Sequence, residues 1–542
     1  MTLLPRKSAR SQGVHEQGIV DFLDAIAGSG IELHGFMLLK HGAVVAQTSW
    51  APYERDAPHL LYSLSKSFLS VAAGIAESEG LLSMQDCLAD RLPEAADYGE
   101  ATIADALRMS VGHLFDPVLD PSQDNTDVSD AALRRMLRSY APERAPGEVF
   151  TYDQLATFAV AKIIEDASGT SLMEYLRPRI LDPIGATEAR WYGGEQNFGF
   201  SGLYLRTESI AAFGQLLLQR GEWQGRQLIP RDWLAAATSI QMPNDSAHRF
   251  PPGQPVDSFS AGGYGYQFWI NPQGYLAGGA YGQTCLVLPQ LDAVVAITAS
   301  TEAGQRVLEH VWTHLLPALA GGGEREPDHS DSLAARLANL SVPAPIAGLP
   351  EAARTKALAT LGMLAAAVTA LRGEAADARW PQIAAGAAQR AEEAMAVALA
   401  SRSAAAPLAP PELHDVGQVV FERKLTASAA PDVRFGALGA LDLPELTQVR
   451  LLGSDLELTL GGQPSTLPVG SSDWRRGEVG GDLPIPFATR GGWSPEGRFE
   501  AELRMVETPH VGYLSLDPGT ASFTFTWREP TLMGRDLSGY RI

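Results

Sequence analysis

The sequence predicts an α+β protein: an antiparallel sheet beside a helical cluster, then an alanine-rich helical segment, then a C-terminal all-β sandwich or barrel. Three observations support this prediction. Strand-like segments at both ends of the first region enclose mostly helical sequence, a glycine-rich break occupies residues 321–327, and apolar residues alternate with polar ones toward the C-terminus. We expect domains at residues 1–322, 323–411 and 412–542, the middle one combining a linker with the alanine-rich segment.

The first predicted domain begins with a helix and a pair of strands. Residues 19–26 predict a helix, and residues 33–39 and 43–47 predict two strands around the turn Lys40-His41-Gly42. A helix that contains Ser63 and runs to Ala76 follows, apolar nearly all round. Further helices are expected at 156–165, 208–220 and 231–239, and further strands at 264–270, 284–288 and 293–298.

The two later domains differ in character. Apolar residues at helical spacing between 358 and 371 form a stripe typical of a packing surface, residues 383–399 predict a second helix, and a Pro/Ala stretch at 404–411 ends the segment. Three sets of residues near the C-terminus alternate as in strands with one wet face: Leu456, Leu458 and Leu460; Phe499, Ala501, Leu503 and Met505; Phe523, Phe525 and Trp527. This β region has no titratable cluster that suggests chemistry, so we interpret it as a structural or substrate-shaping module.

Composition excludes several classes of partner. An apolar content of 45% with 19% charged residues is typical of soluble globular proteins. A net charge of −21 argues against nucleic-acid binding and against an anionic membrane surface. No run reaches membrane-spanning length and the first residues do not form a secretory signal, so a cytoplasmic location is expected. The sequence leaves the oligomeric state open, a homo-oligomer included.

Cysteine and metal chemistry have little support in the sequence. Cys87 and Cys285 are too few for a disulfide framework or a Cys-rich metal site, so they are either two buried thiols or one bridge. No His-Glu-x-x-His, Cys-x-x-Cys or phosphate-loop pattern is present. We therefore expect no metal site.

The most informative stretch holds the sole Ser-x-x-Lys match in the chain, Ser63 and Lys66. Residues three apart lie on one face of a helix. A serine hydroxyl is a poor nucleophile until a base takes its proton, and a lysine amine can do so when burial keeps it neutral. The apolar neighbours favour such burial, and the alternative is a surface lysine one turn from a capping serine.

Two further segments could complete an acylating site, which needs a proton shuttle and backbone N–H donors for an oxyanion. Tyr152-Asp153-Gln154 is a polar triplet between a turn and a predicted helix. Residues 277–283 are a glycine-rich entry to a predicted strand, where backbone can approach a ligand closely.

At these three places the chain resembles the serine β-lactamase and penicillin-binding-protein superfamily, most closely its class C β-lactamase-like serine hydrolases and esterases. Residues 61–68 resemble the Ser-x-x-Lys helix start, Tyr152-Asp153-Gln154 stands where the family has Tyr-x-Asn, and residues 278–282 resemble the third motif, usually Lys-Thr-Gly or His-x-Gly. The resemblance extends from residue 14 to about residue 300 with the motifs in order. It implies a β-lactamase/transpeptidase-like domain.

The resemblance also implies roles for individual residues. Ser63 would attack a carbonyl and become acylated, while Lys66, alone or through Tyr152, would take its proton. Tyr152 would pass a proton to the leaving group, and the N–H groups of Ser63 and Gly279 would form the oxyanion hole. Water would then release the acyl group with Tyr152 or Lys66 as base. Gly278 would line the substrate site beside Gly279, and no metal or organic cofactor is implied.

Two departures from the family pattern affect the expected substrate. Gln154 replaces the usual asparagine, which lengthens the arm of a substrate-contacting carboxamide. The cation of the third motif is missing, since Leu276 or Ala277 occupies its place. In the family that cation helps to hold a substrate carboxylate. Its loss favours small esters or amides that lack this carboxylate, and the expected cytoplasmic location favours them too.

Three functions remain in competition at this point. The first is a serine hydrolase of small esters or amides, the second a β-lactamase or D-amino-acid peptidase, and the third a non-catalytic binding or scaffold protein that retains the fold. A Ser-His mechanism is the main rival chemistry, but no Gly-x-Ser-x-Gly elbow exists. We therefore expect structural roles for the four histidines of the catalytic region, His34, His41, His59 and His113.

Overall fold

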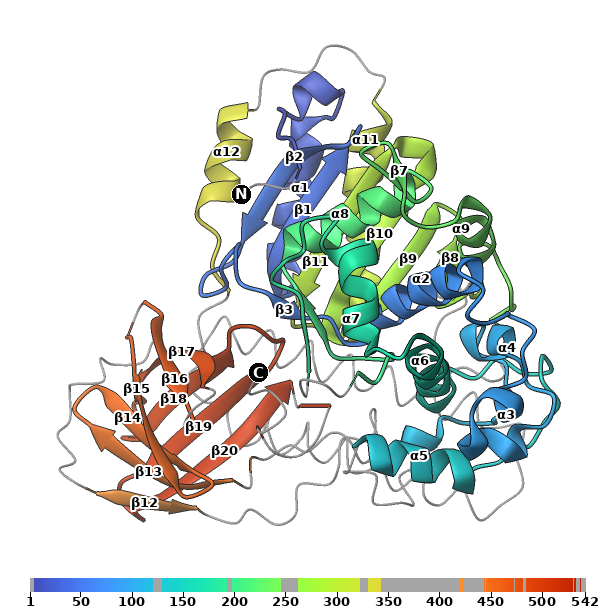
Figure 1. Ribbon diagram of the computed structural model, residues 1–542. Helices are drawn as coiled ribbons and strands as arrows, with labels where there is room; N and C mark the ends of the chain where they lie inside the picture. The colour runs from blue at the N-terminus through green and yellow to red at the C-terminus, as the bar shows by residue number, and fades with distance from the viewer. Residues whose placement is uncertain are drawn as a thin grey trace, which may run out of the picture.

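The computed structural model describes residues 4–119, 129–192, 197–244, 262–321, 330–342, 419–423, 443, 445–471, 473–480, 484–529, 531–532 and 537. The predicted α+β class is confirmed: a domain of sheet and helices lies beside a C-terminal β domain (Figure 1). The helices predicted between 358 and 399 lie outside the described residues.

Among the described residues, six antiparallel strands form the central sheet in the order β2-β1-β11-β10-β9-β8. Their bounds are β1 (Leu33–Lys40), β2 (Ala43–Ser49), β8 (Trp269–Asn271), β9 (Gly274–Gly279), β10 (Gln283–Leu288) and β11 (Ala293–Ala299). β1 pairs with β11 from Leu33↔Ala299 to Lys40↔Ala293, so the two ends of the domain meet at the centre of the sheet. The strands predicted at 33–39, 43–47, 284–288 and 293–298 are confirmed.

The strand predicted at 264–270 is wrong for most of its length, because β8 begins only at Trp269. Gln267 has φ 63°, in the left-handed region, which interrupts an extended chain. Its side-chain amide donates to Leu107 O at 2.8 Å and ties this turn to the helical cluster. β9 was not predicted, since three of its six residues are glycine and strand composition is weak there.

Helices cover both faces of the sheet (Figure 1). Phe36 and Leu38 of β1 face a core shared with α1, whereas Met37 and Leu39 face a core shared with α8. The α1 face comprises α1 (Glu16–Gly28), α10 (Gly304–His310), the π-helical turn η9 (Val311–Leu315), α11 (Leu316–Ala320) and α12 (Ser330–Ala338), and the opposite face carries α8 (Thr207–Leu218). The helices predicted at 19–26 and 208–220 are confirmed.

A helical cluster packs beside the sheet around α2 (Ser65–Ser78) and α6 (Gln154–Ser168). The predicted helices at 156–165 and 231–239 are confirmed. The remaining elements of this domain are η1 (Arg10–Gln12), η2 (Tyr62–Leu64), α3 (Leu88–Arg91), η3 (Pro93–Tyr98), α4 (Ile103–Leu107), η4 (Pro117–Leu119), α5 (Asp130–Ser139), α7 (Leu172–Leu176), η5 (Arg177–Leu181), α9 (Arg231–Ala237), η7 (Ala280–Gly282), η8 (Pro289–Leu291) and the short strands β3 (His59–Leu60), β4 (Arg190–Trp191), β5 (Leu203–Leu205), β6 (Glu222–Trp223) and β7 (Arg226–Gln227).

The C-terminal β domain is a nearly closed barrel, which decides between the two predicted architectures. In the described part of the chain its nine strands form one sheet in the order β15-β14-β13-β12-β20-β19-β18-β17-β16. The end strands approach one another, since Gly480 N–H after β16 donates to Ser465 Oγ of β15 at 3.1 Å. The strands are β12 (Val420–Arg423), β13 (Leu446–Leu452), β14 (Asp455–Leu460), β15 (Gln463–Pro468), β16 (Arg475–Val479), β17 (Ile485–Trp493), β18 (Phe499–Met505), β19 (Val511–Asp517) and β20 (Ser522–Glu529).

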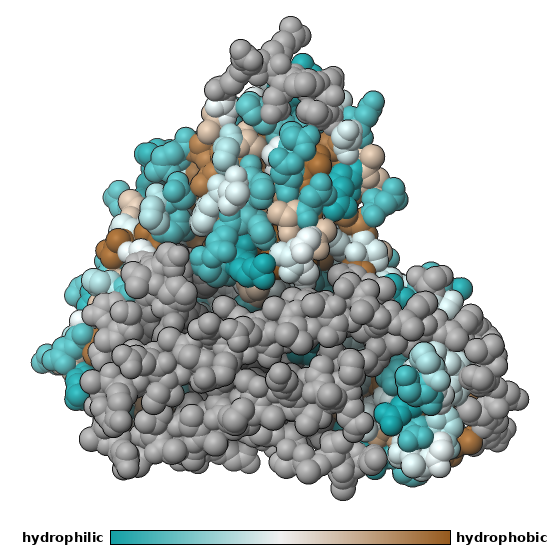
Figure 2. Space-filling model, turned by 180° about the vertical axis from the view of Figure 1, so that it is seen from behind, coloured by the Kyte–Doolittle hydropathy of each residue, from teal (hydrophilic) through white to brown (hydrophobic). Residues whose placement is uncertain are grey.

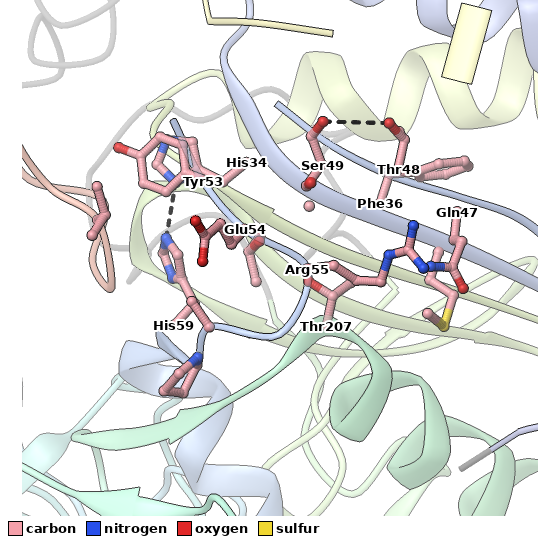
Figure 3. A pocket seen from close by; sticks show the side chains of 16 residues that line it. His34, Phe36, Gln47, Thr48, Ser49, Tyr53, Glu54, Arg55, His59 and Thr207 are labelled. Atoms are coloured by element: carbon pink, nitrogen blue, oxygen red, sulfur yellow. Dashed lines mark hydrogen bonds between the residues drawn. The ribbon is translucent and has the colours of Figure 1, made fainter. Parts of the chain in front are cut away.

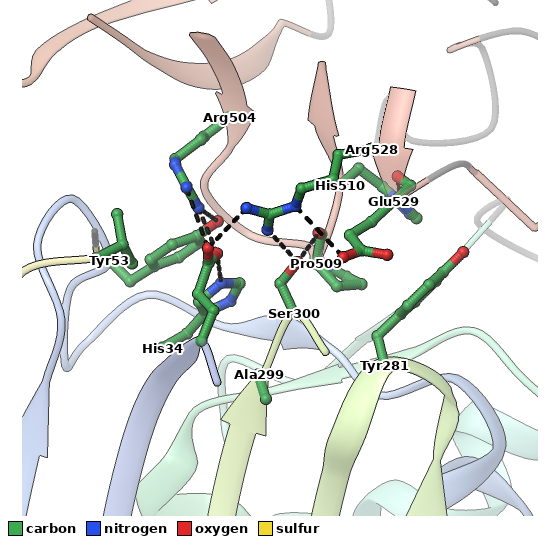
Figure 4. Close-up of polar contacts among 12 residues, drawn as sticks. His34, Tyr53, Tyr281, Ala299, Ser300, Arg504, Pro509, His510, Arg528 and Glu529 are labelled. Atoms are coloured by element: carbon green, nitrogen blue, oxygen red, sulfur yellow. Dashed lines mark hydrogen bonds and ion pairs between the residues drawn. The ribbon is translucent and has the colours of Figure 1, made fainter. Parts of the chain in front are cut away.

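A buried charge cluster joins the barrel to the first domain (Figure 4). Arg504 of β18 donates to Glu32 Oε2 at 3.1 Å, and Arg528 of β20 forms an ion pair with the same oxygen at 2.9 Å. Burial raises the pKa of Glu32, but Arg504 and Arg528 outweigh it and hold the pKa well below its ordinary value. His34 Nε2 lies 2.9 Å from Glu32 Oε1, so this histidine belongs to the domain junction.

No helix among the described residues combines the length and the apolar character needed to cross a bilayer. Seen from behind, the coloured part of the first domain is mostly hydrophilic, with small separate hydrophobic patches (Figure 2). Cys87 and Cys285 are both free thiols, so the bridge is wrong; Cys285 is buried as expected, whereas Cys87 is only half-buried.

Candidate active site

Ser63 lies on the short 3-10 turn η2, and Lys66 lies in the first turn of the helix α2 that follows it. Two hydrogen bonds to β5 fix this corner: Leu61 N–H donates to Leu203 O at 2.8 Å, and Leu203 N–H donates to Ser65 Oγ at 3.0 Å. Lys66 Nζ consequently reaches Ser63 Oγ at 3.2 Å. The predicted proximity of hydroxyl and amine is present.

Lys66 is the buried base-type group of this site, with 1% of its surface exposed. Its Nζ donates to Phe200 O at 2.8 Å and to Gln154 Oε1. Burial lowers the pKa of Lys66 to about 7, against the opposing effect of the nearby carboxylates Asp116 and Asp153. A substantial fraction of the amine is therefore neutral near pH 7, as a general base requires.

Tyr152 lies over the amine of Lys66, whose Nζ is 4.9 Å from the centre of the phenol ring. The ring stacks on Trp269 at 5.5 Å with an interplanar angle of 12°. Burial raises the pKa of Tyr152, while a hydrogen bond with the Ser63 side chain acts in the opposite direction. Ser63, Lys66 and Tyr152, distant in sequence, are thus brought into one group.

The backbone around Tyr152 is held by the loop that follows α4. Thr151 N–H donates to Met109 O at 2.9 Å, and Asp153 caps α6 by accepting from Ala156 N–H at 2.9 Å. His113 Nδ1 lies 2.6 Å from Asp153 Oδ2. Burial lowers the pKa of His113, but Asp153 raises it more. His113 therefore orients the segment that presents Tyr152 and Gln154.

The third predicted segment ends β9 beside the turn that carries Ser63. A Cβ on Gly279 would lie 2.0 Å from Leu61 O and 3.1 Å from Leu64 N, so only glycine fits there. Gly278 has no such crowding, because its nearest neighbours are at ordinary contact distance. Leu276 and Ala277, where the family pattern has a cation, are buried and apolar.

Sequence reasoning missed two residues at this site. Asp116 is buried, its Oδ2 has no hydrogen-bond partner among the described residues, and burial and Asp153 raise its pKa well above the ordinary value. Phe200 supplies a backbone carbonyl to Lys66. A contact through a backbone carbonyl cannot be predicted from the side-chain pattern. Asp116 could have been, because an aspartate within the apolar run Leu114-Phe115-Asp116-Pro117-Val118 indicates a buried carboxyl group.

A pocket opens elsewhere, at the junction of the central sheet with the barrel (Figure 3). His34, Tyr53 and His59 line it, with His34 Nδ1 2.9 Å from His59 Nε2 and the Tyr53 ring stacked on His34. None of the sequence-predicted site residues lines this pocket. In the described chain, no group of three or more His, Cys, Asp or Glu side chains is arranged to hold a metal ion.

The structure combines an antiparallel sheet with helices on both faces and a Ser-x-x-Lys turn packed against β9 and β10, as in the β-lactamase fold. A model of the Beta-lactamase family matches residues 34–319, more than half of the chain. The chain belongs to this family.

Similar proteins include hydrolases and penicillin-binding proteins. A 6-aminohexanoate-dimer hydrolase of Paenarthrobacter ureafaciens is 24% identical over 289 residues, which cover 49% of this chain and 72% of that protein. A solved Bacillus anthracis protein provisionally described as a 6-aminohexanoate-dimer hydrolase is 22% identical, with a TM-score of 0.45 over 54% of this chain and 80% of its own. A penicillin binding protein from Bacillus halodurans is 17% identical, with a TM-score of 0.44 over 54% of this chain and 99% of that protein.

Proposed function

We propose that this protein is a serine hydrolase that cleaves a small ester or amide through an acyl-serine intermediate. The observation that carries the proposal is the contact of Lys66 Nζ with Ser63 Oγ at 3.2 Å, together with Tyr152 over the same amine. A hydroxyl, an amine whose pKa is lowered to about 7 and a phenol are what nucleophilic catalysis by serine requires.

In the proposed reaction Ser63 Oγ attacks the substrate carbonyl while neutral Lys66 accepts its proton. The N–H groups of Ser63 and Gly279 donate to the oxyanion that forms. When the tetrahedral intermediate collapses, Tyr152 gives its proton to the leaving alcohol or amine and recovers one from the Lys66 ammonium. Water then attacks the acyl-serine while Tyr152 or Lys66 takes its proton. The bond between Ser63 Oγ and the acyl carbon breaks, the acid leaves, and the same base returns the proton to Ser63 Oγ.

The charges around the site support a substrate without a carboxylate near the reacting carbonyl. Leu276 and Ala277 are buried apolar residues and offer no cation. An anionic substrate group would therefore find no positive partner at the third motif to offset its desolvation. The relative named as a 6-aminohexanoate-dimer hydrolase is compatible with the amide alternative.

The other two functions are less well supported. A β-lactamase or D-amino-acid peptidase needs the cationic anchor that is replaced here by buried apolar residues. A non-catalytic scaffold would not require a buried lysine with a lowered pKa beside a serine. Turnover of cephalosporins or D-alanyl amides in preference to esters would favour the peptidase function.

Covalent labelling tests the proposal directly. A fluorophosphonate probe is expected to modify the wild-type protein once per chain, and mass spectrometry of the digested protein is expected to place the adduct on Ser63. Ser63→Ala should take up no probe and should not hydrolyse p-nitrophenyl esters. Labelling at another residue, or full ester hydrolysis by Ser63→Ala, would refute the assignment.

The pH profile is a second expected result. Because the neutral amine of Lys66 is the active form and its pKa is about 7, kcat/KM should rise with pH through about 7 and then level off. The measurement is the initial rate of p-nitrophenyl ester hydrolysis between roughly pH 5 and pH 9, corrected for spontaneous hydrolysis. A profile that falls with rising pH across this interval would contradict Lys66 as the base.

A further inference from the structure

The loop between β18 and β19 of the barrel carries Pro509 and His510 and lies near Ser300 and Tyr281 of the first domain (Figure 4). Leu60 lies two residues before η2, the turn that carries Ser63, and its N–H donates to Glu507 O at 2.8 Å. Ser300 Oγ, directly after β11, donates to Pro509 O at 2.7 Å. This loop therefore contacts the first domain at two places, just before η2 in the sequence and just after β11.

His510 ends this loop, and its surroundings fix its hydrogen-bonding role. The ring is fully buried, with Nδ1 3.1 Å from Glu529 O and Nε2 2.7 Å from the Tyr62 hydroxyl. A carbonyl only accepts, so Nδ1 carries the proton, and in the neutral ring Nε2 accepts from the Tyr62 hydroxyl. Leu532 N–H donates to the same hydroxyl at 3.4 Å. The side chain adjacent to Ser63 is thus held by the barrel.

Tyr62 and Tyr281 both have backbone conformations that aromatic residues rarely adopt. Tyr62 has φ 49° and precedes Ser63, and Tyr281 has φ 60° and lies in η7, two residues after Gly279. Such conformations are strained and persist only where surrounding contacts enforce them. The turns on either side of the expected oxyanion hole are therefore both strained.

The ring of His510 contacts both strained tyrosines. Its centre lies 5.8 Å from the ring centre of Tyr62 and 5.9 Å from that of Tyr281, each edge-on, and the two tyrosines lie 5.7 Å apart. The side-chain amide of Gln283 also holds η7, since it donates to Tyr281 O at 3.2 Å and to Ala299 O at 2.8 Å. The side chain of His510, from the barrel, thus packs against both η2, which carries Ser63, and η7, which follows Gly279.

We propose that His510 is a positioning residue of the active site, which the C-terminal barrel contributes to the catalytic domain. This role rests on the proposed serine hydrolase function and deepens it. By holding Tyr62 and Tyr281, His510 sets the distance between the turn that carries Ser63 and the end of β9 at Gly279. The barrel is then part of the catalytic apparatus rather than an attached module.

Removing the contact between His510 and Tyr62 is expected to slow the chemical step rather than weaken substrate binding. Oxyanion donors act at about 2.7–3.1 Å, and a misplacement of about 1 Å can slow a reaction up to about 100-fold. Loss of the Tyr62–His510 hydrogen bond relaxes the turn without touching the groups that bind substrate. The expected signature is a fall in kcat of about 10-fold or more while KM changes little.

The test compares full-length variants on a p-nitrophenyl ester. Tyr62→Phe removes only the hydroxyl, His510→Leu removes the ring nitrogens, and His510→Gln keeps an acceptor for the Tyr62 hydroxyl. We expect the first two to lower kcat about 10-fold with little change in KM, and His510→Gln to recover most of the rate. Arg476→Ala is the matched control, because Arg476 also contacts the first domain, 2.9 Å from Glu54 Oε1, without reaching either turn.

The outcomes separate this inference from the proposed function. Wild-type kcat in folded Tyr62→Phe and His510→Leu, or an equal loss in Arg476→Ala, would overturn the positioning role while Ser63 labelling still upheld the hydrolase. Failure of the wild-type protein to react with either the fluorophosphonate or the ester would refute the hydrolase and the positioning role with it. Circular dichroism and the melting temperature identify variants that are not folded, and Tyr62→Phe then decides.

Discussion

Lys66→Met is expected to lower kcat/KM for p-nitrophenyl esters by about 1,000-fold or more, because it removes the base and the route by which the leaving group is protonated. Lys66 contacts Ser63 Oγ, Gln154 Oε1 and Phe200 O, so the substitution acts at the centre of the site. Methionine fills a similar volume and avoids burying a charge, so the fold should persist. Steady-state rates and circular dichroism on the same preparation measure both effects.

Lys162→Met provides the matched control for this prediction. Lys162 is also buried, but it lies on α6 away from Ser63 and pairs with Asp130 at 2.8 Å and Glu165 at 2.7 Å. Its replacement should reduce stability and leave kcat per folded molecule unchanged. An ester hydrolysis rate close to wild type in Lys66→Met would eliminate Lys66 as the base and leave Tyr152 as the candidate.

Glu32→Ala is expected to lower the free energy of unfolding by about 3–5 kcal/mol. The substitution removes the carboxylate that Arg504 and Arg528 both approach, and it leaves Arg504 paired with Glu502 and Arg528 paired with Glu529. Two buried guanidinium groups then share fewer negative charges, and buried charge that is only partly compensated is costly. Urea denaturation followed by circular dichroism measures the change.

Glu54→Ala separates this effect from a general loss of charge at the junction. Glu54 pairs with Arg476 at 2.9 Å, but both side chains are largely exposed, at 62% and 41%. Exposed pairs contribute about 0–1 kcal/mol, so this variant should unfold nearly as the wild type does. Equal destabilisation by the two substitutions would show that the buried ion pairs of Glu32 contribute no more to the free energy of unfolding than an exposed pair does.

Local patterns were sufficient to predict the parts of the candidate site that lie on or beside regular elements. The helix predicted to contain Ser63 begins only at Ser65, but the 3-10 turn that precedes it still places Ser63 Oγ 3.2 Å from Lys66 Nζ. Tyr152 and Gln154 were found through a motif that stands at the start of a helix, where Asp153 acts as N-cap. In each case the information lies within a few consecutive residues.

The remaining parts depend on contacts between residues far apart in sequence. Phe200 enters through a backbone carbonyl, and Glu32 and Arg504 meet only after two domains have packed. The strand predicted at 264–270 is interrupted by the positive φ of Gln267. Propensity and periodicity describe neighbours along the chain, so they could not place these groups.

Because His510 contacts Tyr62, the order in which the chain is synthesised affects when the candidate site can be completed. A ribosome adds about 5–20 residues per second, so roughly 20–90 seconds separate the emergence of Lys66 from that of His510. During this interval the nascent polypeptide has its nucleophile segment without the histidine that braces it. Hydrolytic competence is therefore expected late in biogenesis, and a chain interrupted before residue 510 would leave a largely inert catalytic half.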